Sequence, residues 1–362
     1  MNSIGTSGAG LISILKKVSP LSENRIASVL YRGPAELLTN LPEQTAKEIA
    51  ELLHTAGLDC LAVDETYTFE PGDADHEVAL VIRDFARMPD VLEQIMLILG
   101  VDVETARKIV CTSPTVLVGG ISKNTVQALL ARFAPLGVEL DVSRPGEALF
   151  DVFLGETTAL NRQQVLRLLR DNKIPLLDSK NGEQPLLAVE LPREQADKLW
   201  ERLKRTSYPV RIVNRDFQRF DLRLDQASNS PEMMQYLQTS TGMPEKVAQK
   251  VPHKTPLILQ QNIRFSDLAA HMEQIQLLGG KASGHLLVFQ TFSLEITKVG
   301  DHKASTNAVR FITGLKEDEA LEIVTRTHKL GEPLAEPLTY PQALWLQTEL
   351  GKAGTDSHLV IL

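Results

Sequence analysis

The chain has 362 residues, 43% hydrophobic and 23% charged, which is typical of a globular protein too long for a single hydrophobic core. Its net charge of −8 argues against a nucleic-acid partner held by the overall field of the protein. Cys60 and Cys111 lack the spacing of a disulfide framework or zinc site, no stretch is apolar enough for a membrane span, and no basic leader begins the chain. We therefore expect a cytoplasmic protein.

Five predicted amphipathic helices recur along the chain with one spacing. Each lies between an apolar residue and a small residue 16 positions later (41 and 57, for example), and the residues 5 and 12 positions after the apolar one are also apolar. Those two positions are two helical turns apart, so they lie on one buried face. The apolar residues are Leu41, Ile121, Leu191, Ile263 and Leu338, and the small ones are Gly57, Gly137, Ser207, Gly279 and Gly354. A spacing held five times predicts an internal repeat.

Strands are predicted on both sides of these helices. A strand follows each helix, at residues 58–63, 138–142, 208–213, 285–289 and 358–362. An earlier strand opens four of the repeats, at residues 77–82, 148–154, 219–224 and 292–297. The first repeat begins directly on a helix at residues 10–18. The glycine-rich segment before that helix, Gly5 to Gly10, lacks the ending of a phosphate-binding loop and is predicted to be a mobile terminus.

The sequence thus predicts an α+β protein, a tandem array of five two-layer β-α-α-β-α-β units. Each unit holds a small three-stranded sheet with helices on one face. The units span residues 1–66, 76–143, 147–214, 217–289 and 290–362. Unit 1 lacks its first strand, and the second helix of unit 3 is degenerate because residues 171–185 are rich in turn formers. Strand segments 78–82, 286–289 and 359–362 are apolar on both faces, which predicts that neighbouring units cover the second face.

This unit resembles the C-terminal domain of the bacterial ribosomal stalk protein, whose fold is shared with the Clp protease adaptor. The fifth unit matches best, through AVR at 308–310, TGL at 313–315, Glu319–Ala320 and Val324. The resemblance implies a domain that binds other proteins; the stalk domain recruits translational GTPases through basic residues of its first two helices. Of those residues Arg310 is present, whereas Asn307 and Leu321 stand where the family has lysines.

The arginines near the junction of units 3 and 4 are the main candidate for a partner-binding surface. In the predicted strand 219–224, Phe220, Leu222 and Leu224 face inward, which places Arg219 and Arg223 on the outer face. This face is either merely solvated or a docking patch for an acidic partner or RNA. The candidate partner-binding residues are Arg211, Arg215, Arg219, Arg223 and Arg310.

No residue set has the pattern of a catalytic or metal-binding site. The eight histidines share no metal-ligand spacing, and no nucleophile is paired with a base in a known motif. We therefore expect no enzymatic activity, no metal and no cofactor. The leading hypothesis is a non-enzymatic scaffold or adaptor that binds protein partners. The alternatives are a translation-associated factor that contacts ribosome-acting GTPases and an enzyme with a site between repeats. The missing strand of unit 1 predicts an open sheet edge and possible self-association there.

Overall fold

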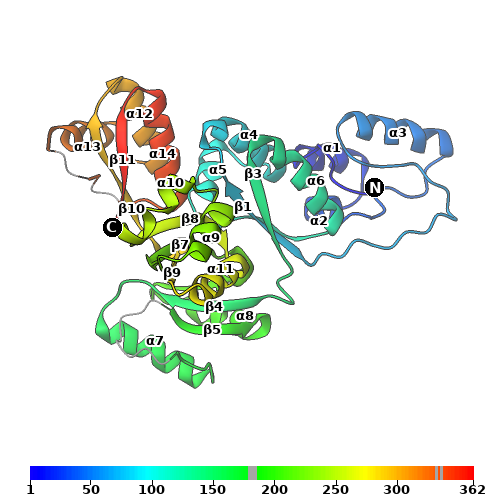
Figure 1. Ribbon diagram of the computed structural model, residues 1–362. Helices are drawn as coiled ribbons and strands as arrows, with labels where there is room; N and C mark the ends of the chain where they lie inside the picture. The colour runs from blue at the N-terminus through cyan, green and yellow to red at the C-terminus, as the bar shows by residue number, and fades with distance from the viewer. Residues whose placement is uncertain (178–185, 331–332, 335–336) are drawn as a thin grey trace. The chain divides into compact units, whose positions relative to one another are not determined.

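The computed structural model describes residues 1–177, 186–330, 333–334 and 337–362. The chain divides into two compact units. Residues 1–146 and 291–362 form one, called here the terminal unit, and residues 147–290 form the other, the central unit (Figure 1). Both breaks fall within one residue of borders between predicted repeats.

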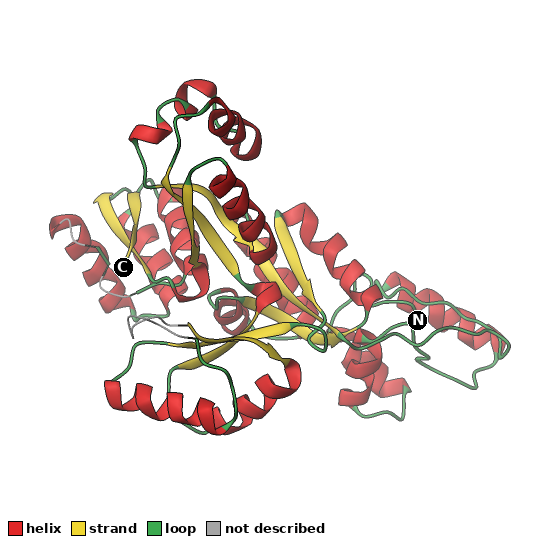
Figure 2. Cartoon of the chain, turned by 60° about the horizontal axis from the view of Figure 1, so that its bottom comes forward, coloured by secondary structure: helices red, strands yellow, loops and turns green. Residues whose placement is uncertain are grey.

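The central unit contains two three-stranded antiparallel sheets, with strand orders β5-β4-β6 and β8-β7-β9. The first strand of each sheet therefore lies in its middle. Helices α7 and α8 lie on one face of their sheet (Figure 2). The elements are β4 (Leu149–Leu154), α7 (Ala159–Asp171), β5 (Leu186–Pro192), α8 (Arg193–Leu203), β6 (Val210–Asn214), β7 (Arg219–Gln226), α9 (Pro231–Thr241), α10 (Glu245–Ala248), β8 (Leu257–Arg264), α11 (Phe265–Leu277) and β9 (Lys281–Leu286).

The terminal unit has a third antiparallel sheet of order β2-β1-β3 and a two-stranded sheet, β10-β11. Its elements are α1 (Gly10–Val18), α2 (Glu23–Tyr31), α3 (Glu43–Thr55), β1 (His76–Ile82), α4 (Met88–Leu99), α5 (Val103–Val110), β2 (Thr115–Ile121), α6 (Lys123–Phe133), β3 (Val138–Ser143), β10 (Phe292–Lys298), α12 (His302–Thr313), α13 (Glu317–Leu330), α14 (Tyr340–Lys352) and β11 (Asp356–Ile361). The described chain is thus a mixed α+β protein with several small antiparallel sheets.

The five helices with the common spacing are confirmed as α3, α6, α8, α11 and α14. Each begins directly after its N-cap residue, and these caps are Pro42, Ser122, Pro192, Arg264 and Thr339. Their predicted inward positions are buried, except that Ala46 is half-buried. The four glycines that follow them have φ between 69° and 91°, the left-handed conformation that glycine adopts without a steric penalty.

The start of the chain differs from the prediction in two ways. Residues 1–75, all of them described, contain no β-strand; the segment predicted as strand 58–63 forms one isolated bridge, between Ser3 and Asp59. The glycine-rich N-terminus is packed rather than mobile, because Ile4 is fully buried and the Thr6 amide donates to the Gly57 carbonyl at 2.8 Å. Residues 2–6 therefore pack beside residues 57–59, in the place of the opening strand that unit 1 is predicted to lack. Because residues 1–75 form no sheet, the predicted open sheet edge is absent.

Two further strand predictions are corrected. In place of a strand at 285–289, β9 ends at Leu286 and a 3₁₀ turn spans Leu287–Phe289. In the described part of residues 290–362, two strands are present where three were predicted. On the other side of β10 that part of the chain forms an isolated bridge from Leu338 to Phe292 and a hydrogen bond from the Leu334 amide to the Leu294 carbonyl. Pro333 and Pro337 have no amide hydrogen to donate to a longer ladder there. Residues 172–177 contain no helix, as predicted for the degenerate second helix of unit 3, and residues 178–185 lie outside the described part.

The central unit has two large hydrophobic clusters, one on each sheet, and a smaller third cluster. The third joins Phe153 and Val213 of the first sheet to Val288, with Leu186 and Leu286 packed against it. These residues come from both halves of the central unit, so each half covers apolar surface of the other. In the terminal unit, Val78 to Ile82 of β1 are all buried, which accounts for their continuous apolar sequence.

Candidate functional site

The central unit holds four of the five arginines predicted to bind partners, and Arg215 is the most deeply engaged. It lies in a 3₁₀ turn between β6 and β7, and its side chain is 16% exposed. Its Nε donates to both oxygens of Asp151, at 3.0 and 2.9 Å, and its Nη1 donates to Glu190 at 2.9 Å. Its guanidinium carbon lies 5.0 Å from the centre of the Phe265 ring, a cation–π contact.

Asp151 is the centre of this network. It lies in the middle strand β4 and is 3% exposed. Besides Arg215, its carboxylate accepts hydrogen bonds from the Gln218 amide at 2.9 Å and from the Glu190 backbone N–H at 3.0 Å. A buried carboxylate is stable when its charge is compensated and its oxygens are hydrogen-bonded. Burial opposes the charge on Arg215, but its bonds to Asp151 and Glu190 prevail and raise the pKa of Arg215.

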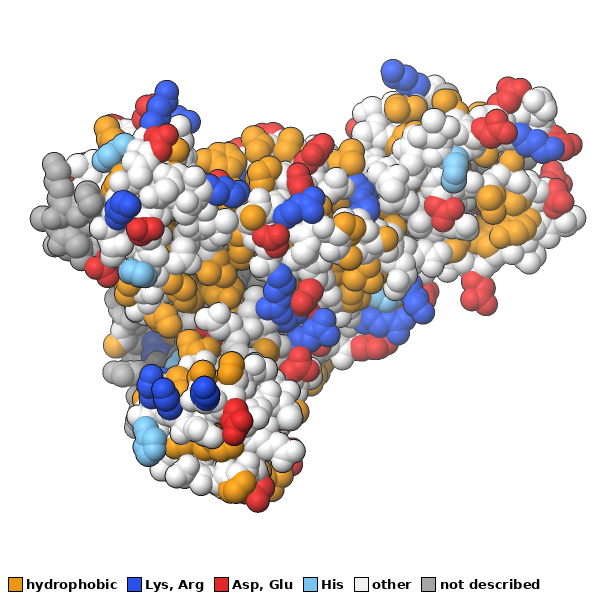
Figure 3. All heavy atoms as spheres, turned by 45° about the horizontal axis from the view of Figure 1, so that its top comes forward, with side chains coloured by type: hydrophobic (Ala, Val, Ile, Leu, Met, Phe, Trp, Pro, Cys, Tyr) orange, Lys and Arg blue, Asp and Glu red, His pale blue; other side chains and the backbone are white. Residues whose placement is uncertain are grey.

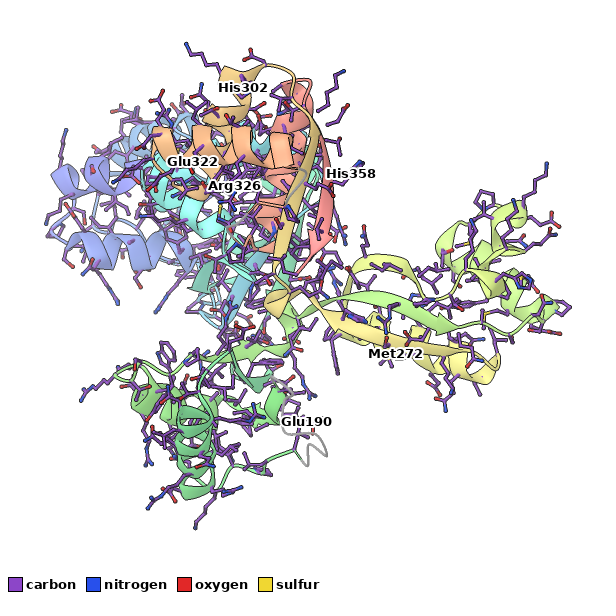
Figure 4. The ribbon with its side chains drawn as sticks, turned by 90° about the vertical axis from the view of Figure 1, so that its left-hand side faces the viewer. Glu190, Met272, His302, Glu322, Arg326 and His358 are labelled. Atoms are coloured by element: carbon purple, nitrogen blue, oxygen red, sulfur yellow. The ribbon has the colours of Figure 1, made fainter. Side chains whose placement is uncertain are left out.

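Glu190 owes its position to a distortion of the edge strand β5. Its φ is 61°, which is rare for a residue other than glycine, and the register of β5 against β4 shifts at this point. Figure 4 labels Glu190 in the first sheet of the central unit. Asn262 repeats the arrangement in the second sheet, with φ 56° and its N–H donating to the buried Asp221 at 3.0 Å.

Asp221 has the place of Asp151 but a different environment. Arg215 forms its hydrogen bonds with Asp151. At Asp221, burial raises the pKa of the carboxyl, while the Asn262 N–H and the nearby His285 act in the opposite direction. The same strand position therefore holds an ion-paired acid in one sheet and a poorly solvated acid in the other.

The other arginines of this cluster are also engaged within the central unit. Arg219 is 7% exposed and donates to the Asn262 carbonyl at 2.9 Å. Arg211 donates to the Val288 carbonyl at 3.1 Å, and burial lowers its pKa. Arg223 pairs with Asp225 at 2.6 Å and is 41% exposed. The expectation of an exposed outer face is thus wrong for Arg219, because the second face of this sheet is covered.

A cavity of about 500 Å³ lies beside the Asp151 network and is lined from both halves of the central unit. Its apolar walls are formed by Phe153, Leu186, Val189, Phe220, Phe265 and Leu286. Its polar lining is formed by Asp151, Arg215, Gln218, His285 and Gln290. An apolar cavity with a few converging polar groups is the usual form of a ligand site. Met272 of α11, labelled in Figure 4, packs against the core of the second sheet.

The fifth predicted residue, Arg310, lies apart from this cluster in the sequence, on α12 of the terminal unit. It is 47% exposed and lies 3.7 Å from Glu317, an ion pair of the exposed kind that contributes little to stability. Leu321 on α13 is 48% exposed. Figure 4 labels Glu322, the next residue on α13, and Arg326, about one helical turn beyond Glu322.

Sequence reasoning missed Asp151, Gln218, Phe265 and Gln290. The sequence did contain one signal for Asp151, because this acidic residue lies among the apolar residues of the strand at 149–154. Asp221 has a similar place in its own strand. Such an acid, if buried, needs a partner. The partner itself could not be found, since Arg215 and Gln218 lie more than 60 positions from Asp151 in the sequence.

Comparisons with protein-family models, with curated proteins and with solved structures found no match to this chain. In the described part of the chain, no group of three or more His, Cys, Asp or Glu side chains is placed to hold a metal ion. Among the described helices, none combines the length and the apolar character that crossing a membrane requires.

Proposed function

We propose that this protein is a non-enzymatic scaffold or adaptor, a tandem array of five related α/β units that binds other proteins. The units are those of residues 1–66, 76–143, 147–214, 217–289 and 290–362, and they resemble the ribosomal stalk C-terminal domain. Tandem arrays of small domains present extended surfaces, and such surfaces commonly bind proteins.

The observation that supports the array best is a common strand register. The apolar residue before the recurrent helix pairs with an equivalent position of the middle strand in each of three sheets: Ile121 with His76, Leu191 with Phe150, and Ile263 with Phe220. The isolated bridge between Leu338 and Phe292 follows the same pattern. The residue before the apolar one has φ between 56° and 68° in Asn40, Gly120, Glu190 and Asn262.

The outer faces of the helices support a role in binding. Large apolar side chains stand exposed on them, including Leu160 at 65%, Trp200 at 50% and Leu277 at 75%. Trp is a frequent anchor of protein interfaces. On the face shown in Figure 3, acidic and basic side chains are interspersed, which favours specific contacts over attraction by one large field.

The experiment is affinity purification of the full chain from its native cell, followed by reconstitution with each purified candidate partner. We expect at least one partner that binds directly, and weaker binding for Trp200→Ala or Leu277→Ala than for the wild type. Lys47→Ala, on an exposed and merely ion-paired side chain, serves as the control. A chain that binds no purified partner, or that turns over a small molecule, would refute the adaptor role.

The second candidate is a factor that contacts translational GTPases through residues 290–362. Arg310 is exposed, as such a surface requires, but Asn307 and Leu321 supply no charge. Exposed charge mainly sets the association rate, so we expect no stalk-like recruitment. The test is binding of a purified elongation factor at low and high salt. Tight, salt-sensitive binding that Arg310→Ala abolishes would favour this candidate over the first.

A further inference from the structure

The Asp151 network leaves two polar atoms unused beside the cavity of the central unit. Within the described part of the chain, Nη2 of Arg215 donates no hydrogen bond and Oε1 of Gln218 accepts none. Both residues line the cavity. We propose that this cavity binds a neutral aromatic carboxamide, whose carbonyl accepts from Arg215 Nη2 and whose N–H donates to Gln218 Oε1. This inference concerns a ligand site and does not depend on the adaptor role.

Both unused atoms are open to solvent. In the described part of the chain, the side-chain N and O atoms that are buried without a hydrogen-bond partner belong to other residues, namely Asp75, His76, Gln290 and Ser357. Nη2 of Arg215 and Oε1 of Gln218 also lack a partner but are not buried in this way, so water reaches them. The Arg215 side chain accordingly is 16% exposed. A ligand group that makes the same hydrogen bonds can take the place of that water.

Asp151 holds the two atoms next to each other. Arg215 Nε and Gln218 Nε2 each donate to the same oxygen, Asp151 Oδ2, at 2.9 Å. Because a carboxylate only accepts, this bond fixes the Gln218 amide with its nitrogen on Asp151 and its oxygen turned away. The Phe265 ring lies 5.0 Å from the guanidinium carbon and restrains its plane. A fixed donor beside a fixed acceptor is the complement of a carboxamide.

The walls of the cavity favour a flat ring. Three phenyl rings line it, and two of them, Phe220 and Phe265, have centroids 5.9 Å apart at an angle of 48°. Aromatic rings pack well against other rings at such distances and tilts. Leu186 and Val189 add aliphatic surface on the side of β5. About 500 Å³ is ample for one ring that carries a carboxamide.

The charges of the network select a neutral ligand. Arg215 already pairs with two carboxylates, those of Asp151 and Glu190, so a ligand anion would meet no free positive charge. A ligand cation would find the Asp151 oxygens occupied by three donors, and Glu190 is 62% exposed, so water screens its charge. Either ion would lose hydration that the cavity does not replace, whereas a carboxamide brings no charge to be desolvated.

The experiment compares four small probes by NMR titration of the full chain. Benzamide has the proposed ring and carboxamide, acetophenone keeps the ring and carbonyl without the N–H, benzoate is the anion, and acetamide lacks the ring. We expect saturable binding of benzamide, with acetophenone about fivefold weaker because one hydrogen bond is lost. Benzoate and acetamide should each bind at least about tenfold more weakly, through desolvation of charge and loss of the apolar contact.

A variant tests the role of Gln218. In Gln218→Leu the preference for benzamide over acetophenone should fall below about twofold, because the acceptor for the N–H is gone. This comparison within one variant holds even if the substitution changes overall affinity, and the comparison of probes on the wild type stands even if the variant does not fold. No saturable binding of benzamide, or equal binding of benzamide and any other probe by the wild type, would overturn the proposal.

A second pair of variants tests the location. Val189→Trp should fill the cavity and abolish binding of benzamide, whereas Val116→Trp, on the edge strand β2 at a position 39% exposed, should leave it unchanged. Undiminished binding by Val189→Trp would place the ligand elsewhere and refute the site. Neither result depends on whether an adaptor partner is found.

Discussion

Replacing Asp151 by alanine should destabilise the central unit strongly. The change leaves Gln218, which is 2% exposed, and the Glu190 N–H without their acceptor. It also leaves Arg215 without its buried counterion. Removing one partner of a buried ion pair costs about 3–5 kcal/mol. Because Glu190, 62% exposed, still pairs with Arg215, we expect the lower part of that range, about 3 kcal/mol.

Asp221→Ala is the matched control. Asp221 lies at the same place in the second sheet and is equally buried, but its carboxylate accepts a hydrogen bond from the Asn262 N–H, and its electrostatic neighbour is His285 rather than an arginine. An unsatisfied backbone donor costs about 1–3 kcal/mol, and removing a carboxylate that is disfavoured by burial offsets part of this. We therefore expect a loss near the bottom of that range, clearly smaller than for Asp151→Ala.

Hydrogen exchange measured by mass spectrometry is the suitable assay, because a chain with two compact units has no single free energy of unfolding. Protection should fall in residues 147–290 of the Asp151→Ala variant and stay unchanged in the terminal unit. Asp151→Ala combined with Arg215→Met should recover part of the loss, since no unpaired charge remains buried. Equal losses for Asp151→Ala and Asp221→Ala, or a loss under about 1 kcal/mol for the first, would refute this account of the network.

Two further predictions follow from close contacts and burial. In Gly8→Ala the new Cβ would lie 2.0 Å from the Leu97 carbonyl oxygen, so we expect the terminal unit to lose about 1–3 kcal/mol of stability in hydrogen exchange; Gly10→Ala, with no atom within 4 Å, should be neutral or slightly stabilising. Burial raises the pKa of Asp221 above 3.8, so the folded state binds its proton more tightly than the unfolded chain does. Wild-type stability should therefore rise relative to Asp221→Asn as the pH falls from 7 towards 4, and an unchanged difference would contradict the shift.

The helices could be predicted from the sequence because their determinants are local. Ser122 and Thr339 cap their helices with their own side chains, and Gly137 and Gly354 end the following turns with positive φ. These signals act within a few residues, and the inward positions of each helix follow from its 3.6-residue period.

Strand pairing and the site could not be predicted in the same way. The segment at 58–63 has a suitable composition for a strand, yet within it only Asp59 forms a β-bridge, with Ser3. The expected exposed arginine face depended on alternation within one strand, whereas the burial of Arg219 depends on what covers that strand. Both outcomes depend on residues that are distant in sequence. The alternation of inward and outward side chains along one strand does not reveal which distant residues pair with that strand or cover it.

Arg107 allows a last prediction, on how the terminal unit holds together. This side chain on α5 is 5% exposed, and its Nη1 donates at 2.9 Å to the carbonyl of Ile312, 205 positions later and next to the end of α12. A cation at a helix C-terminus stabilises the unpaired carbonyls there. Its hydrogen bonds to Glu104 outweigh its burial and raise the pKa of Arg107, so it stays charged.

Arg107→Met keeps much of the apolar stem but removes this charged donor. We expect a loss of about 2 kcal/mol, the value of a hydrogen bond to a charged group, and faster exchange at the C-terminal end of α12. Lys108→Met, at a neighbouring side chain 69% exposed, should change stability by less than about 0.5 kcal/mol. If both variants lose the same amount, or if α12 keeps its protection in Arg107→Met, the contact does not hold residues 103–110 to the end of α12. A loss confined to Arg107→Met would instead mean that the TGL turn at 313–315 is fixed by a residue from a different predicted repeat.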